Sequence, residues 1–211
     1  MDRAYIHQNH LAGLSNHYSS DRSDLIWTPD EIALFLDGDA ERRVDPAPTH
    51  LRRLFTTALE TGLRPGDIRI LSRAHIQATE KGRRIYIRTA KRKRFVSIPV
   101  TEAMGRVIDT TPTGQVQIIV GERGQPYAQT PSLGQAVSRR RDECGIRKEL
   151  QLRDTRGTAA TRLFEADATL REIAAHMGWS VAHTAKMIET YVRMNPDASD
   201  RLLIRLQSTG V

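Results

Sequence analysis

Apolar residues recur at helical spacing along most of the chain. After Thr49, five apolar residues fall on one face of a predicted helix that Gly62 can end. An earlier helix is predicted from Thr28-Pro29, an N-cap followed by a first-position proline, to about Arg43. Helical patterns also predict segments at about 101–110, 131–144, 155–166, 170–177, 182–192 and 197–207.

The period changes between Ala74 and Val100. The runs HIQAT, RRIYIRTA and RFVSIPV read as short strands, divided by Glu80-Lys81-Gly82 and by a basic tip. A three-stranded antiparallel sheet is the simplest arrangement, so the predicted fold is α+β and mainly helical. Residues 1–26 are rich in Asn, His, Ser and Asp, which indicates a linker or arm before a domain at 27–211.

Composition narrows the function. The 211 residues include 39% hydrophobic ones, enough for one large domain with a core, and a net charge of +7 favours a polyanionic partner. Nucleic acid is the first candidate and an anionic membrane surface the second. The chain has neither an apolar run near the roughly 20 residues needed to span a bilayer nor an apolar signal core. We therefore expect a soluble, cytoplasmic protein.

Two arginines have settings that suit phosphate binding. Arg64 lies on a turn between helical segments, and Arg156 lies near a predicted helix N-terminus, where backbone N–H groups also favour phosphate. An arginine fork can hold two phosphate oxygens and stays protonated at any working pH. Two such residues could replace a metal clamp, although each by itself could be an ordinary surface arginine.

A basic stretch follows in the predicted sheet. Residues 83–94 hold seven basic residues and no acidic one, in a strand and hairpin tip that could lie along a DNA backbone. A lysine at this tip could also protonate a departing 5′ oxygen, because an ammonium can donate a proton where a guanidinium cannot. Lys91 is the first candidate and Lys93 the second. The candidate DNA-binding residues are Arg83, Arg84, Arg88, Arg92, Lys93 and Arg94.

Tyr191 is a candidate nucleophile near the end of the chain. It lies in TAKMIETYVRM, on a predicted helix with Met187 and Ile188 on its inward side. A half-buried packing role is the simpler interpretation of such a tyrosine. Because a phenol has a pKa near 10, it would need nearby positive charge or a base before it attacked phosphorus.

Together these segments resemble the catalytic domain of the tyrosine recombinases, the phage integrase family, over about residues 27–207. TGLRPGD matches the family's first-arginine motif, with Arg64 as that arginine and Asp67 steadying the site. Lys91 matches the hairpin lysine, eight residues before Pro99. RDTRGT matches the family's second-arginine motif, with Arg156 as that arginine. Gly178-Trp179 and then Tyr191 follow in the family's order.

The sequence departs from the family pattern at three points. Arg153 stands where the family usually has a histidine, and an arginine cannot shuttle protons. Arg153 could still hold the phosphate and lower the phenol pKa by its charge. Trp179 replaces the commoner histidine and offers an indole N–H donor. The N-terminal core-binding domain of the family is expected to be absent.

The resemblance implies a site-specific DNA recombinase or integrase that acts through a 3′-phosphotyrosyl intermediate. The implied partner is double-stranded DNA, bound by a homo-tetramer, with a monomer allowed without DNA. No metal or cofactor is expected, and the implied location is the cytoplasm, in association with the nucleoid, for a protein of bacterial or phage origin. A last helix at 197–207 could dock on a neighbouring subunit or on its own domain.

Two other interpretations remain open at this point. Residues 169–191 also resemble a helix-turn-helix, so a DNA-binding regulator without catalysis, or a degenerate integrase fragment, is the alternative function. His7, His10 and His17 could be considered as a metal site, but a solvated linker explains them more simply. Cys144 is the only cysteine, which excludes an internal disulfide and a cysteine-based zinc site.

Overall fold

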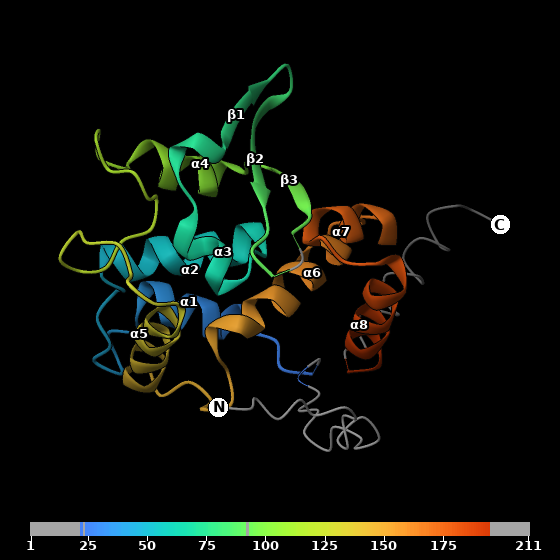
Figure 1. Cartoon of the computed structure of the whole chain (residues 1–211). Helices are drawn as coiled ribbons and strands as arrows, with labels where there is room; N and C mark the ends of the chain where they lie inside the picture. Colours follow the sequence, from blue (N-terminus) through green and yellow to red (C-terminus); the bar gives the residue numbers. More distant parts are fainter. Residues whose placement is uncertain (1–21, 23, 92, 195–211) are drawn as a thin grey trace, which may run out of the picture.

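The computed structural model describes residues 22, 24–91 and 93–194, which form a mainly helical α+β fold (Figure 1). The helices in this part are α1 (Pro29–Asp37), α2 (Thr49–Thr61), α3 (Pro65–Ile70), α4 (Glu102–Asp109), α5 (Thr130–Glu143), α6 (Thr155–Glu165), α7 (Leu170–Met177) and α8 (Val181–Met194). The strands are β1 (Ile76–Thr79), β2 (Gly82–Arg88) and β3 (Phe95–Pro99), and 3-10 turns lie at Arg73–His75 and Leu152–Asp154. The predicted fold class is confirmed.

Two helices differ from the sequence prediction. The prediction that the first helix runs to about Arg43 is wrong, because α1 ends at Asp37. Gly38 adopts a φ of 73°, and a Cβ there would lie 2.2 Å from the carbonyl oxygen of Val44, so only glycine fits this tight reversal. The short helix α3 was not predicted, because six residues are too few to show a helical period.

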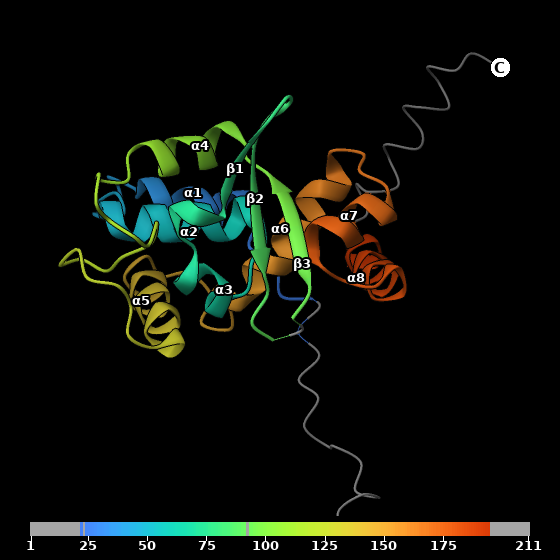
Figure 2. The ribbon, with the colours of Figure 1, turned by 45° about the horizontal axis from the view of Figure 1, so that its top comes forward.

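The sheet is antiparallel, in the order β1-β2-β3 (Figure 2). Ile85 pairs with Ile98 and Ile87 with Val96, and all four side chains are buried. Since side chains alternate along a strand, the residues between them face away from the core. The basic side chains of β2 are thereby divided between the two faces of the sheet.

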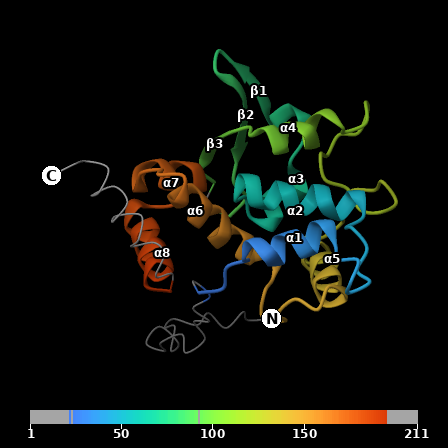
Figure 3. The same ribbon diagram turned by 180° about the vertical axis from the view of Figure 1, so that it is seen from behind.

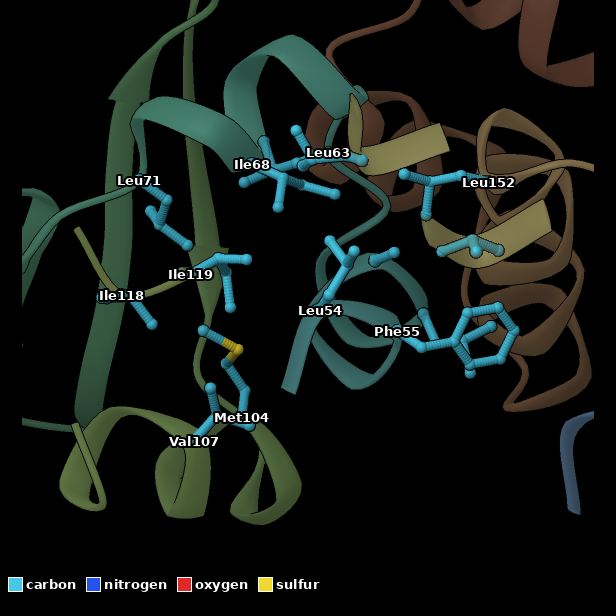
Figure 4. Packing of buried hydrophobic residues seen from close by; sticks show 14 of the residues in the cluster. Leu54, Phe55, Leu63, Ile68, Leu71, Met104, Val107, Ile118, Ile119 and Leu152 are labelled. Carbon is cyan, nitrogen blue, oxygen red and sulfur yellow. The ribbon is translucent and has the colours of Figure 1, made fainter. Parts of the chain in front are cut away.

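The main core is built around α2 (Figure 4). Leu54 and Phe55 are fully buried, and Phe55 stacks on Phe35 of α1 with ring centroids 4.0 Å apart. Trp27 packs edge-on against Phe55 at 4.8 Å. Figure 4 shows the sulfur-bearing side chain of Met104 on α4 approaching the same centre. This core fixes α2, whose C-terminal end leads directly into the segment of Arg64.

Helices α6, α7 and α8 form a second, smaller cluster on one side of the molecule (Figure 3). Ala159, Ile173, Met177 and Ile188 are its buried centre. The two clusters meet at Gly62, where a Cβ would lie 2.6 Å from the Met177 sulfur. The end of α2 and the end of α7 are thus in close contact.

Several predicted features lie outside the described residues. These are the histidines at 7, 10 and 17, Arg92, and the predicted helix at 197–207. The other predicted helices correspond to α2 and to α4 through α8. No helix in the described ranges has the length and apolar character needed to cross a membrane.

Candidate active site

Four of the predicted site residues line one cavity of about 310 Å³: Arg64, Arg153, Arg156 and Trp179. We call this cavity the arginine pocket. Arg64 is the N-cap of α3, Arg153 lies in the 3-10 turn before α6, Arg156 is in the first turn of α6, and Trp179 follows the glycine that ends α7. The tertiary structure therefore joins three separate segments at this point.

Arg156 organises the arginine pocket by binding two other helix ends. Its guanidinium donates to the carbonyl oxygen of Gly62 after α2 and, over 3.1 Å, to that of Met177 at the end of α7. Carbonyls at a helix C-terminus have no partner within their own helix, so Arg156 satisfies groups that would otherwise need solvent. The Trp179 ring lies with its centroid 5.4 Å from the Arg156 Cζ, within the range of a cation–π contact.

Arg64 and Arg153 have guanidinium groups that are available for a ligand. Arg64 is half-buried and has an extended backbone with φ −68° and ψ 150°. Arg153 is exposed. Within the described ranges, neither guanidinium makes a hydrogen bond or an ion pair. The pocket thus combines one arginine fixed by the fold with two that can bind an anion.

The hairpin tip that carries Lys91 is attached to α3 by Asp67. Asp67 is 1% exposed, and its Oδ1 accepts a hydrogen bond from the Ala90 N–H at 2.8 Å. Its Oδ2 is buried and has no hydrogen-bond partner among the described residues. Lys91 follows Ala90, is exposed, and does not line the arginine pocket. The lysine therefore lies beside α3, whose N-cap is Arg64.

The other basic residues of the sheet are not equivalent. Arg84 donates to the Ser97 hydroxyl at 2.8 Å and, like Arg88, faces away from the core. Lys93 and Arg94 are exposed at the tip. Arg83 lies on the opposite face and pairs with Asp109 of α4, with Nη2 2.9 Å from Oδ2. Its contact with DNA remains a prediction, as do those of the other members of this set.

Tyr191 does not line the arginine pocket. Its phenol donates a hydrogen bond to the Glu165 carboxylate, and its ring packs edge-on against Phe164 with centroids 6.4 Å apart. Tyr191 and Glu165 instead line a larger pocket of about 1250 Å³. Glu165 lies near the C-terminal end of α6, about 13 Å along the helix from Arg156 at a rise of about 1.5 Å per residue. Tyr191 is 8% exposed.

His176 is a half-buried neighbour of Arg156 in the arginine pocket. Burial lowers the pKa of its imidazole below the ordinary value, and the positive charges of Arg84 and Arg156 act in the same direction. A hydrogen bond with the Thr61 backbone opposes this shift. Its Nε2 has no hydrogen-bond partner in the described ranges.

The sequence reasoning missed six residues that line the arginine pocket: Arg22, Leu25, Asp154, Gly157, His183 and Met187. The His183 ring packs edge-on against Trp179 with centroids 4.8 Å apart. His183 and Met187 lie four residues apart, on the face of α8 that continues toward Tyr191, and this spacing was the available signal. Nothing comparable marked Arg22, which lies in the segment interpreted as an arm.

Known structures show the same fold. XerA recombinase is similar with a TM-score of 0.64 and 20% identity, over 86% of this chain and 64% of that chain. A lambda integrase dimer bound to a COC′ core site gives a TM-score of 0.61 and 20% identity, over 77% and 47% respectively. The lambda integrase catalytic core gives a TM-score of 0.58 and 19% identity, over 72% of this chain and 90% of that chain. The chain thus spans about half of the lambda integrase chain in the dimer and most of its catalytic core.

The sequence itself also has a match at the level of a family. Comparison with curated proteins finds no match. The model of the phage integrase family matches residues 26–197, which include every residue that lines the arginine pocket except Arg22 and Leu25. The chain belongs to the phage integrase family.

Proposed function

We propose that this protein is a site-specific recombinase that breaks and rejoins DNA, with Tyr191 as nucleophile. The observation that carries the proposal is the convergence of Arg64, Arg153 and Arg156 on one cavity. The non-bridging oxygens of a phosphodiester gain negative charge during attack, and arginine forks stabilise that charge while staying protonated. The arginine pocket therefore suits the scissile phosphate, and residues 27–211 would form the catalytic domain.

The proposed reaction exchanges one phosphoester for another. The Tyr191 phenol gives its proton to water, and its phenolate oxygen bonds to phosphorus. The bond from phosphorus to the 5′ oxygen breaks, its electron pair goes to that oxygen, and Lys91 gives a proton to the oxygen, which departs as a 5′ hydroxyl. A 5′ hydroxyl then attacks the phosphorus of the 3′-phosphotyrosyl link and returns its proton to Lys91, and the Tyr191 phenolate leaves and takes a proton from water. Because no bond is hydrolysed, rejoining needs no nucleotide.

The surroundings of Lys91 support its role as the general acid. The hydrogen bond from the Ala90 N–H to buried Asp67 holds the hairpin tip against α3. Arg64 is the N-cap of the same helix. A lysine ammonium can release a proton, whereas the neighbouring arginines cannot. Asp67 is then a positioning residue for Lys91, which must reach the 5′ oxygen when DNA is bound.

Arg153 and Trp179 complete the proposed phosphate site. Arg153 supplies charge rather than proton transfer, because its guanidinium does not deprotonate in proteins. The Trp179 indole N–H would donate to a phosphate oxygen, and its ring also packs beside Arg156. Positive charge in the pocket would lower the pKa of the Tyr191 phenol once the phenol enters it.

Cleavage requires a rearrangement of Tyr191. The phenol is hydrogen-bonded to Glu165 and lines the larger pocket rather than the arginine pocket. It must leave that carboxylate before its oxygen can approach a phosphate held by the arginines. We propose that DNA binding moves α8 or its end, and that the Glu165 contact holds Tyr191 away from the phosphate until then.

We propose double-stranded DNA as the partner. The exposed basic residues of the β2–β3 hairpin, with Arg84 and Arg88 on the outer face of the sheet, suit a phosphate backbone. The solved structures similar to this chain include a lambda integrase tetramer bound to a Holliday junction. By that likeness, this chain would act as a homo-tetramer on paired sites of nucleoid DNA in the cytoplasm, and as a monomer without DNA.

The non-catalytic alternative is not favoured. A regulator without enzymatic activity would use α7 and α8 as a helix-turn-helix, joined at Gly178 with its φ of 62°. It leaves unexplained why three arginines from two segments far apart in the chain line one cavity, two of them without a partner in the described ranges.

The experiment that tests the function is capture of a covalent protein–DNA adduct. Nicked duplexes of randomised sequence would be incubated with the protein, denatured, and resolved by gel electrophoresis. The expected result is an adduct that Tyr191→Phe abolishes and that sequencing assigns to a limited set of sites. The matched control is Tyr127→Phe, a half-buried tyrosine that packs against the main core. Normal DNA binding without any adduct would favour the non-catalytic alternative.

A further inference from the structure

Arg22 lies at the arginine pocket but precedes the segment that the family model matches. Its Nε donates to Asp154 Oδ1 at 3.0 Å, and one terminal nitrogen donates to Asp154 Oδ2 at 2.7 Å. The same nitrogen also donates to the carbonyl oxygen of Glu149. This two-point pairing with Asp154 raises the pKa of Arg22 above its ordinary value.

Asp154 presents a difficulty for a phosphate site. It lies between Arg153 and Arg156 in the chain, and it is the only carboxylate among the described residues that line the arginine pocket. Its side chain is 3% exposed, so water screens its charge poorly. An unpaired carboxylate at this place would repel a phosphate oxygen and cancel part of the attraction of the arginines.

We propose that Arg22 is a positioning residue for the scissile phosphate. Arg22 neutralises Asp154 and so preserves the attraction of the arginine pocket for a phosphate. The proposal rests on the proposed function, because it assigns the pocket to phosphate. Arg22 acts through Asp154 rather than as a catalytic residue. Its contribution comes from a segment that the sequence pattern assigned to a linker or arm.

The fold explains why Asp154 is present despite this cost. Its Oδ2 also accepts a hydrogen bond from the Gln151 N–H at 2.7 Å, which closes the 3-10 turn that carries Arg153. The carboxylate therefore shapes the turn, and Arg22 compensates its charge. Removing Arg22 alone would leave a buried charge without its partner, a change more harmful than removing both charges together.

This relation predicts a specific rescue. Arg22→Gln should weaken phosphate binding by at least about tenfold, because an uncompensated charge in a poorly screened site opposes the anion. Arg22→Lys should retain most of the affinity, since it keeps the charge although not the fork. Asp154→Asn keeps an oxygen for the Gln151 N–H, so the double variant Arg22→Gln/Asp154→Asn should return to within about threefold of the parent protein.

The test measures binding of inorganic phosphate to the full chain by calorimetry, at constant ionic strength maintained with chloride. Each variant is also melted without phosphate to record its Tm. Arg106→Gln is the matched control, because Arg106 forms an ion pair with Glu102 on the exposed side of α4. A purely structural Arg22 would lower the Tm and leave the phosphate affinity unchanged in the folded protein.

Three results would overturn the proposal. The first is an Arg22→Gln variant with the parent affinity for phosphate. The second is a double variant as weak as Arg22→Gln, which would show that Arg22 does not act through Asp154. The third is a parent protein whose phosphate binding is absent or insensitive to Arg156→Ala. If Arg22→Gln does not fold, Arg22→Lys and the double variant still decide, because both keep the charges balanced, and a tenfold loss of phosphate affinity in either would contradict the proposal.

The proposed function has a separate readout. Covalent adduct formation that depends on Tyr191 tests strand cleavage without reference to Arg22. An adduct in the parent protein together with an unaffected Arg22→Gln variant would reject the role of Arg22 alone. Absence of an adduct from the parent protein, with phosphate binding and the rescue intact, would reject cleavage and leave the charge compensation standing.

Discussion

The arginine pocket and the Tyr191–Glu165 pair lie toward opposite ends of α6 and are held in different ways. The arginine pocket is fixed by the fold: Arg156 binds the ends of α2 and α7, and Arg22 neutralises Asp154. The Tyr191 phenol donates to the exposed Glu165 carboxylate, and its ring packs against Phe164. The difference teaches that the residues proposed to bind phosphate already share one cavity, whereas Tyr191, the proposed nucleophile, would have to move to reach it.

The largest effects are expected from the arginines themselves. Arg64→Ala and Arg156→Ala should each reduce adduct formation by about a hundredfold or more, because each removes charge stabilisation of the transition state. Only Arg156→Ala should also lower the free energy of unfolding, by about 1–3 kcal/mol, since it leaves the Gly62 and Met177 carbonyls unpaired. Adduct assays and urea denaturation would measure the two quantities. Equal losses of DNA binding and cleavage would indicate a purely structural role.

The next effect concerns the link between Asp67 and the hairpin tip. Asp67→Ala should release the Ala90 N–H and reduce adduct formation by about tenfold, because the general acid loses its position. Hydrogen exchange at Ala90 should become faster at the same time. Asp109→Ala is the control, since it removes the pair with Arg83 at the start of β2 and leaves the tip attached. A slow Ala90 exchange in Asp67→Ala would contradict this mechanism.

A smaller change in the opposite direction is expected at Glu165. Glu165→Gln should weaken the hydrogen bond that holds the phenol and raise the rate of adduct formation about three- to tenfold. Glu102→Gln, on the exposed side of α4, is the matched control. A lower rate in Glu165→Gln would mean that Glu165 accepts the phenol proton during attack rather than restraining Tyr191.

The smallest effect is expected from His176 and depends on pH. Burial lowers its pKa, so the folded protein holds the neutral ring while the unfolded chain binds a proton near pH 6.5. The free energy of unfolding should therefore fall as the pH decreases below about 6.5. His176→Gln should make this dependence flatter, as measured by urea denaturation between pH 7 and 5. An unchanged dependence would show that other groups cause it.

Local sequence patterns identified most of the elements correctly. The Thr28 capping box begins α1 as predicted, and Gly62 ends α2 with a φ of 58°. The alternation of Ile85 and Ile87 marked the inner face of β2. These features depend on neighbours within a few residues, so one sequence is enough to reveal them. The end of α1 was missed because the reversal at Gly38 depends on contact with Val44.

The candidate site was only partly accessible to the same reasoning. The motifs named Arg64, Arg156 and Trp179, which the fold brings together in one cavity. Asp154 was quoted within a motif without a role, and Arg22 belonged to a segment without a helical or strand period. Their pairing joins residues more than a hundred positions apart, so only the folded chain could reveal it.

The sequence by itself determined most of the helices, the small sheet, the family motifs and the order of the candidate residues. These follow from spacing and residue type, which act locally along the chain. The tertiary structure alone decided that the arginines share a cavity, that Arg22 compensates Asp154, and that Tyr191 is bound to Glu165 instead. The physical reason is that charge compensation and side-chain direction depend on distances between segments, and packing of α6 against its neighbours sets those distances.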